Sequence, residues 1–179
     1  MAQPTVELES QALARAVEGD QEAFRGLVRR NQRLVYSIAW HFFGDRALAE
    51  DLAQEVFLQL YQNLGSIESD SHLVFWLRQV ATRKCIDHLR WLDKRRHASL
   101  EEIGEQPAAA DGAEPDLLET RRLRRLVASL PEKFRAVVVL RFQEDLSPAE
   151  IAQVLGWPLN SVKSRLHRAL KMLRERLEG

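Results

Sequence analysis

The fold is decided by residues 147–170, SPAEIAQVLGWPLNSVKSRLHRAL, which predict a short helix, a tight turn and a second helix. Ser147 stands three residues before Glu150, and Pro148 lies between them. This spacing predicts a capping box and a proline at the first helical position. Gly156 is expected to end the first helix, because glycine readily takes the left-handed conformation that closes many helices. The order is typical of a helix-turn-helix.

The second helix of this unit has an apolar face and a cationic face. Its apolar residues recur at helical spacing and are expected to point inward: Val162, Leu166, Ala169, Leu170, Leu173 and Leu177. Its opposite face carries Lys163, Ser164, His167, Arg168, Lys171 and Arg174. A solvated face is the plainer alternative, since cations suit the negative C-terminal end of a helix dipole. The cations already begin in the first turn, where the dipole disfavours them and recognition helices contact bases, so the pattern favours DNA binding.

The composition is that of an ordinary globular protein, with 45% hydrophobic and 29% charged residues among 179. No apolar run approaches the roughly 18 residues needed to cross a bilayer, and Glu7 and Glu9 stand where a targeting segment would be basic. We therefore expect a cytoplasmic protein without membrane insertion. The lone Cys85 is expected to be a small, buried or half-buried filler in a helix. The histidines form no HExxH pattern and there is no glycine-rich phosphate loop, so we expect no enzyme, no metal and no cofactor.

The formal net charge of zero hides a strong asymmetry along the chain. Residues 1–97 hold 13 basic and 13 acidic side chains, residues 98–120 hold none and 7, and residues 121–179 hold 13 and 6. A basic C-terminal part favours a polyanionic partner, which the charge alone does not identify as DNA, RNA or a membrane surface. The helix-turn-helix makes DNA the best choice.

The fold class predicted is all-α, with two small helical domains joined by a flexible acidic linker. Residues 98–116 contain two prolines, two glycines and no basic residue, and they show little periodicity. The predicted domains are 1–97 and 121–179, with the linker over 98–120. The string Val137–Val139 is assigned to a helix from near Pro131 to before Asp145. The C-terminal domain is expected to have a single small core: Leu126, Leu130, Val138, Leu140, Ile151, Leu155, Val162, Leu166 and Leu170.

The N-terminal domain begins with a helix near residues 8–17, followed by one capped at Asp20 that runs through Phe42 to a break at Gly44. Residues 46–64 form an amphipathic helix, ended by Gly65, whose inward residues are Leu48, Leu52, Val56, Leu60 and Leu64. Its outer face is acidic and rich in amides, with one apolar residue: Asp51, Gln54, Glu55, Leu58 and Gln62. That mixture suits a protein partner, and a normal solvated face is an equal alternative.

After a loop over residues 65–72, the last helix of this domain spans residues 73–96 and changes from apolar to basic along its length. Its second half presents Arg83, Lys84, Arg90, Lys94, Arg95 and Arg96, with aromatic residues interleaved. Cations beside aromatic rings fit a surface that follows a nucleic-acid strand. Trp76, at the apolar start, is assigned to the core rather than to a stacking platform.

Taken in order, these features resemble the extracytoplasmic-function (ECF) group of bacterial sigma factors, in the sigma-70 family. AEDLAQEVFLQLYQNL (49–64) resembles that family's core-polymerase-binding helix, and FWLRQVATRKCIDHLR (75–90) its promoter-melting and upstream-element helix. LPEKFRAVVVLRFQEDLSPAEIAQVLGWPLNSVKSRLHRALKMLRERL (130–177) resembles its C-terminal DNA-binding domain. The resemblance implies a protein that binds core RNA polymerase, recognises the minus-ten and minus-thirty-five elements and assists promoter melting. An anti-sigma factor is the family's common regulator.

The resemblance also implies roles for individual residues. Core polymerase would be bound by Asp51, Gln54, Glu55, Leu58 and Gln62. The minus-ten DNA would be bound by Ser66, Ser69, Ser71, Arg78, Arg83, Lys84, Asp87, His88 and Arg90, with a flipped base in the serine-containing loop. The minus-thirty-five element would be bound by Asn160, Ser161, Lys163, Ser164, Arg165, His167 and Arg168. The acidic linker would follow the path of the nucleic acid it displaces, and a plain solvated spacer is the alternative.

Two departures from the family pattern concern DNA specificity. Arg83 stands where an asparagine is common, and Asn160-Ser161 stands where the pattern usually reads Gly-Thr. Ser161 is expected to cap the recognition helix as threonine does, whereas Asn160 places a hydrogen-bonding side chain at the groove. The main alternative function is a stand-alone helix-turn-helix regulator, which would bind DNA tightly without polymerase. A pure scaffold would leave the cations of the recognition helix without a purpose.

Overall fold

The structure is a computed structural model that describes residues 4–98 and 118–178, and side chains over residues 11–95 and 122–177. Every regular element in these residues is helical, which confirms the all-α prediction. Most of the predicted linker, residues 99–117, lies outside the described residues.

Four long helices form the N-terminal part: α1 (Pro4–Val17), α2 (Gln21–Phe43), α3 (Arg46–Asn63) and α4 (Asp70–Ala98), with a 3-10 turn, η1 (Leu64–Ser66), after α3. Asp20 caps α2 as predicted, accepting from the backbone N–H groups of Glu22 at 2.9 Å and Ala23 at 3.1 Å. Gly44 ends α2 with φ +67°. The helix α4 starts earlier than predicted, because the hydroxyl of Ser69 accepts from the N–H of His72 at 3.1 Å and so caps its first turn.

The C-terminal part contains α5 (Leu118–Ala128), α6 (Glu132–Phe142), α7 (Pro148–Leu155) and α8 (Leu159–Glu178). The capping box of Ser147 and Glu150 is present, and Gly156 follows α7 with φ +65°, so both predicted ends of this helix are confirmed. The valines 137–139 are helical and buried. Residues 135–140 of α6 are buried on every side because the helix contacts α2, α4, α5, α7 and α8, whereas Lys133 and Phe142 near its ends are exposed.

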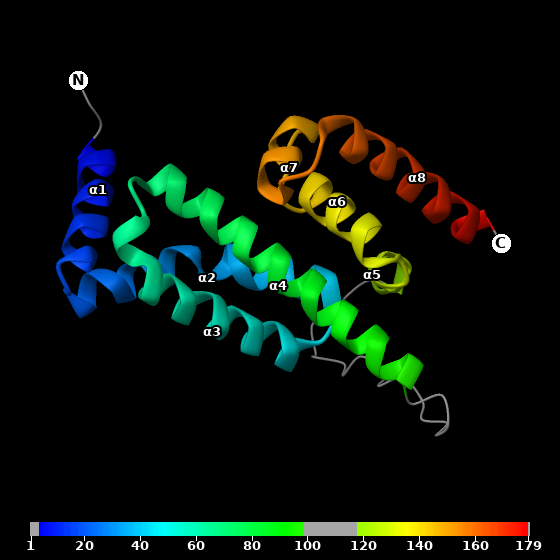
Figure 1. Cartoon of the computed structure of the whole chain (residues 1–179), viewed down its shortest axis with the longest axis horizontal. Coiled ribbons are helices and arrows are strands. Elements are labelled where there is room, and N and C mark those ends of the chain that lie inside the picture. Colours follow the sequence, from blue (N-terminus) through cyan, green and yellow to red (C-terminus); the bar gives the residue numbers. More distant parts are fainter. Residues whose placement is uncertain (1–3, 99–117, 179) are drawn as a thin grey trace.

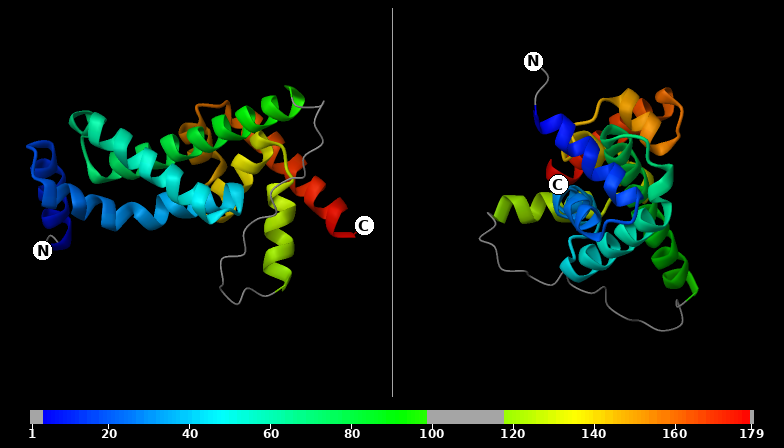
Figure 2. Two further views of the ribbon diagram at one scale, coloured as in Figure 1. Left: turned by 90° about the horizontal axis from the view of Figure 1, so that it is seen from below. Right: turned by 90° about the vertical axis from the view of Figure 1, so that its left-hand side faces the viewer.

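The prediction of a single small core for the C-terminal domain is wrong. Ala136 and Val139 of α6 belong to the same buried cluster as the N-terminal core, and Leu155 and Trp157 pack against it. Two further clusters lie around Val137 and around Val138. Figure 1 shows α4 running through the middle of the molecule, with α2 and α3 on one side and α6 to α8 on the other, and Figure 2 shows the same packing from two further directions.

Three predictions about α8 also need correction. Leu170 and Leu177 are 40% and 47% exposed. The buried stripe of this part of α8 runs instead through Ala169 and Leu173, which pack with Leu130 and Val138. The helix begins at Leu159, and the carbonyl of Pro158 accepts from the N–H groups of Ser161 and Val162 at 2.9 and 3.1 Å. Ser161 therefore lies inside the first turn and does not cap the helix.

Candidate nucleic-acid interface

The α8 helix presents its polar face away from the N-terminal domain, since among the described helices it contacts only α5, α6 and α7. The structure brings all seven predicted residues together on its first three turns: Asn160, Lys163, Ser164, His167 and Arg168 are exposed, and Ser161 and Arg165 are half-buried. The guanidinium of Arg165 lies 4.7 Å from the centre of the Trp157 ring. A cation stacked on a ring in this way has a restricted orientation.

The first turn of α7, the helix that precedes α8, is closed by a capping box. The N–H of Ser147 donates to Glu150 Oε2 at 2.8 Å, and the N–H of Glu150 donates to Ser147 Oγ at 3.3 Å. Hydrogen bonding by the Ser147 side chain, and then by its backbone, lowers the pKa of the Glu150 carboxyl. The cap is thus a charged one at neutral pH, which suits the positive end of a helix dipole.

A second polar face lies along the later turns of α4. Arg83, Asp87 and Arg90 are exposed, and Lys84 and His88 are half-buried. The His88 ring lies between Phe43, at 5.3 Å, and Trp91, at 5.6 Å. Trp91 is half exposed. The Arg95 guanidinium lies 4.7 Å from its ring centre.

Trp91 thus combines a nearby cation with a ring that is about half exposed, and a nucleic-acid base can stack on a surface of this kind. Trp76 packs against the N-terminal core, as predicted.

The serines assigned to the minus-ten loop are exposed, but the loop itself is shorter than predicted. Ser66 belongs to η1, where its hydroxyl donates to the carbonyl of Asn63 at 2.7 Å. The hydroxyls of Ser69 and Ser71 lie 3.0 Å apart, with Ser71 in the first turn of α4. Ser69 and Ser71 therefore form one polar group, and the Ser66 hydroxyl is turned back toward α3.

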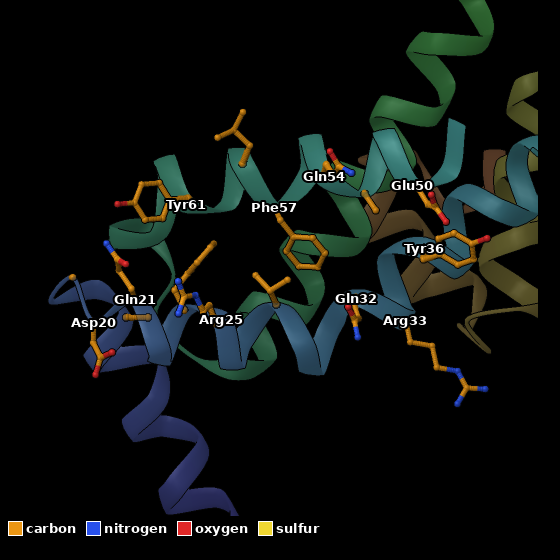
Figure 3. Close-up of a pocket in the computed structure, with 16 residues that line it drawn as sticks. Asp20, Gln21, Arg25, Gln32, Arg33, Tyr36, Glu50, Gln54, Phe57 and Tyr61 are labelled. Carbon is orange, nitrogen blue, oxygen red and sulfur yellow. The ribbon is translucent and has the colours of Figure 1, made fainter. Parts of the chain in front are cut away.

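All five residues of the predicted polymerase-binding stripe on α3 are exposed: Asp51, Gln54, Glu55, Leu58 and Gln62. The stripe meets the cationic face of α4 where Lys84 Nζ lies 2.8 Å from Glu55 Oε2. It also borders a groove of about 960 Å³ between α2 and α3, which Gln54 and Leu58 help to line. Figure 3 shows Phe57 and Tyr61 of α3 facing α2 across this groove.

Sequence reasoning included Leu58 in this surface but missed Tyr61 beside it. Leu58 and Tyr61 are 61% and 60% exposed, and the Tyr61 ring packs edge-on against Phe24 at 5.2 Å. An exposed apolar patch beside a charged stripe is typical of a protein-binding surface. The aromatic residues at 57 and 61, one turn apart, were the signal in the sequence.

Two cations assigned to minus-ten DNA are engaged by the C-terminal domain instead of lying free on α4. Arg78 Nε lies 3.2 Å from Glu144 Oε2, with the side chains 26% and 6% exposed. Arg90 Nε lies 3.6 Å from Glu132 Oε1. Burial raises the pKa of the Glu144 carboxyl, and the attraction of Arg78 offsets only part of that effect.

A buried arginine also joins the two domains and was missed by sequence reasoning. Arg135 Nη1 donates to the carbonyl of Phe42, at the end of α2, at 2.6 Å. Its Nη2 donates to the carbonyls of Ala128 and Leu130, at 3.0 Å for Leu130. A single side chain thus satisfies carbonyls at the ends of α2 and α5. The available signal was a cation placed directly before the apolar run of residues 136–140.

Cys85 is completely buried, as predicted, and burial raises the pKa of its thiol well above the ordinary value. Within residues 4–98 and 118–178, no group of three or more His, Cys, Asp or Glu residues could hold a metal ion. In the same ranges, no helix has both the length and the apolar character needed to cross a membrane.

Comparison with known proteins agrees with this two-part arrangement. Residues 27–95 match the model for Sigma-70 region 2, and residues 120–173 match that for Sigma-70, region 4. The chain is 31% identical over 171 residues to the ECF RNA polymerase sigma factor SigW of Bacillus subtilis (strain 168), with 89% of this chain and 91% of that protein covered.

Two solved structures are similar over most of this chain. One is CnrH in complex with the cytosolic domain of CnrY, with a TM-score of 0.69, 26% identity, and 95% and 97% of the two chains covered. The other is the sigma factor RpoE in complex with the anti-sigma factor NepR from Bartonella quintana, with a TM-score of 0.71, 21% identity, and 87% and 96% covered. At 21% identity, the likeness to RpoE shows a shared fold and no more.

Proposed function

The chain belongs to the extracytoplasmic-function group of the sigma-70 family. From that premise we propose which of its exposed faces binds core polymerase and which faces bind the two promoter elements. It is a non-enzymatic subunit of RNA polymerase that directs promoter-specific initiation of transcription. The match of residues 27–95 to Sigma-70 region 2 sets the stand-alone regulator aside. We assign residues 1–97 to region 2, residues 121–179 to region 4, and the cytoplasm as the site of action.

The α3 stripe and the adjoining groove bind core RNA polymerase. One observation carries this assignment. The five exposed residues of the stripe continue into an apolar patch, which Leu58 of the stripe forms together with Tyr61 beside the groove. Apolar contacts contribute most of the binding free energy, and the rim carboxylates of Asp51 and Glu55 guide the encounter with a basic partner surface.

The first three turns of α8 read the minus-thirty-five element in the major groove. Lys163 and Arg168 neutralise phosphates or read guanine edges, while Ser161 and Ser164 suit phosphate contacts. Asn160, which is exposed at the helix start, adds an amide that pairs well with adenine. Replacing Asn160 with alanine is therefore expected to change the preferred minus-thirty-five sequence in a promoter-library selection, and an unchanged consensus would contradict this role.

The α4 face and the serines before it bind the minus-ten element and assist melting. Flipping one base out of the duplex costs a few kcal/mol. Stacking on a half-exposed ring such as Trp91 returns roughly 1–3 kcal/mol per base, and the cations of α4 add phosphate contacts. Arg83 supplies one of these cations at the position of the family's common asparagine, which favours strand contact over base reading there.

Anti-sigma control is compatible with these faces, because each is open to a protein that competes with polymerase or DNA. The solved relative RpoE is bound to such a factor. We propose that an anti-sigma partner of this chain would cover the α3 stripe or the α4 face.

The assignment of polymerase binding to α3 and of DNA binding to α8 is tested by measuring two properties of the same variants, their affinity for core polymerase and their run-off transcription. Asp51→Asn/Glu55→Gln should weaken binding of the chain to core polymerase, whereas Lys163→Ala/Arg168→Ala should leave that affinity unchanged and abolish run-off transcription. The matched controls are Asp145→Asn/Glu175→Gln and Lys171→Ala/Arg174→Ala, which remove the same charges elsewhere on the surface. The assignments are refuted if each control behaves like its test variant.

A further inference from the structure

The turn that leads into α4 is closed by the side chain of His72. The backbone N–H of Glu68 donates to His72 Nδ1 at 3.2 Å. In the opposite direction, the backbone N–H of His72 donates to Ser69 Oγ at 3.1 Å. The imidazole therefore reaches back over the turn while the serine hydroxyl reaches forward, and the two bonds fix the ring against the turn.

The same turn is anchored on both sides. Ile67 before it and Leu73 after it are 5% and 1% exposed and belong to the N-terminal core. Arg30 Nη2 of α2 lies 3.7 Å from Asp70 Oδ1, in the first turn of α4. Figure 1 shows the turn at the end of the molecule that also holds α1, which contacts both η1 and α4. A segment held in this way loses little conformational freedom on binding, so a ligand meets groups that are already in place.

The bond to Glu68 decides where the proton of the neutral His72 ring lies. Because Nδ1 accepts from a backbone N–H, the neutral ring carries its own proton on Nε2. Thr82 Oγ1 is the only buried side-chain polar atom without a partner among the described residues, and Nε2 also has no partner there, so Nε2 is accessible to solvent. The ring thus offers a free N–H donor, close to the hydroxyls of Ser69 and Ser71, which lie 3.0 Å apart.

This donor lies in the segment to which the minus-ten assignment gives a flipped base. A base that has left the duplex exposes the edge that paired with the other strand, and proteins read that edge by hydrogen bonds. A donor on a fixed ring discriminates between bases better than one on a mobile side chain, because it does not move to suit the wrong base. The serine hydroxyls can both donate and accept, whereas the imidazole N–H only donates.

From this geometry we infer that His72 determines base specificity in the minus-ten loop: its Nδ1 holds the turn, and its Nε2–H donates to an acceptor on the edge of the flipped base. The inference rests on the proposed minus-ten function of this loop. It adds a residue that the assignment of the serines leaves out.

Two substitutions separate the holding of the turn from the reading of the base. His72→Asn keeps an acceptor where Nδ1 is, because the amide oxygen is the same number of bonds from the backbone, but it has no donor at the place of Nε2. His72→Gln carries a donor at about the reach of Nε2 and has no acceptor at the place of Nδ1. Asn63→Ala is the control, since the Asn63 side chain lies on the other side of the turn and donates to the Gln59 carbonyl at 2.8 Å.

The experiment assembles core RNA polymerase with the full chain and selects open complexes from a promoter library in which only the minus-ten element is randomised. At one position of that element, His72→Asn should lower the base preference about fivefold to tenfold and keep the preferences elsewhere. His72→Gln should keep part of that preference with weaker binding overall, and Asn63→Ala should match wild type at every position. Base preferences of His72→Asn that equal those of Asn63→Ala would overturn the inference.

Two further outcomes are decisive. If His72→Asn fails to fold by circular dichroism, His72→Gln is compared with His72→Ala: a preference kept by glutamine and lost by alanine supports base reading, and identical profiles overturn it. If the wild-type holoenzyme selects no base at any minus-ten position, the proposed minus-ten function itself is wrong. If wild type does select bases and His72→Asn selects the same ones, only the role of His72 is wrong.

Discussion

Arg135→Met removes the guanidinium that serves three backbone carbonyls in the middle of the protein, those of Phe42, Ala128 and Leu130. Each buried carbonyl left without a donor costs about 1–3 kcal/mol, and water that enters the site recovers part of this. Methionine keeps a long apolar stem, so little of the loss comes from a cavity. We expect the free energy of unfolding to fall by about 3–5 kcal/mol.

For a chain of this size that loss lowers the melting temperature by about 10 °C, which thermal unfolding followed by circular dichroism measures directly. Arg135→Lys should lie between wild type and the methionine variant, because an ammonium keeps the charge but lacks the planar fork that spans several acceptors. Arg174→Met, at an exposed site on α8, is the control and should not shift the melting temperature. A melting temperature for Arg135→Met within about 2 °C of wild type would refute the role given to this side chain.

Three further predictions concern acid stability, DNA binding and helix capping. Burial lowers the pKa of the His41 imidazole below 6.5, so the folded protein favours the neutral ring. The stability that the buried neutral ring contributes is therefore present above pH 6.5 and is lost as the pH falls through the lowered pKa. His41→Leu should therefore flatten the acid side of the stability curve in urea unfolding between about pH 5 and 7.5, and an equally steep curve would contradict this. Trp157→Leu removes the ring under Arg165 and should weaken binding to a selected minus-thirty-five duplex about threefold to tenfold, whereas Trp157→Phe should lose less. The same loss of affinity when Trp157→Leu is introduced into an Arg165→Ala variant would argue against a role for the stacking of Arg165 on Trp157. Ser147→Ala should cost about 1 kcal/mol of stability by chemical denaturation, through loss of the α7 cap; no measurable loss would show that the cap is dispensable.

Local features of the fold were predictable because they depend on neighbours in the sequence. Asp20, Gly44, Ser147 and Gly156 begin or end helices through bonds within three or four residues, and all four act as expected. The inward residues of α3 also follow from helical spacing, since Leu52, Val56 and Leu60 are buried. Sequence patterns are reliable here because the physics is local.

Contacts between distant segments were not predictable in this way. Arg135 reaches Phe42 across 93 positions of the sequence, and Arg78 reaches Glu144 across 66. Glu144 looks like any acidic residue in a turn until the domain interface buries it. Leu170 was assigned to the core because helical spacing does not reveal which stripe of α8 the neighbouring helices cover: Ala169 and Leu173 are buried, whereas Leu170 is 40% exposed.

The candidate site shows the same difference between local sequence patterns and long-range packing. The faces of α3 and α8 follow from amphipathic periodicity, and all their predicted polar residues are exposed or half-buried. The face of α4 has no such clear periodicity, because this helix is covered by α2 and α3 on one side and by α6 and α7 on another. Which of its cations stay open depends on the packing of the whole chain.

The most direct test of the account is run-off transcription with bacterial core polymerase and purified chain on a promoter obtained by selection from genomic fragments. The account predicts a defined start site that disappears when either the minus-ten or the minus-thirty-five element is scrambled, and that requires both polymerase and this chain. Initiation that survives scrambling of the minus-thirty-five element and the Lys163→Ala/Arg168→Ala substitution would contradict recognition of two elements by two domains.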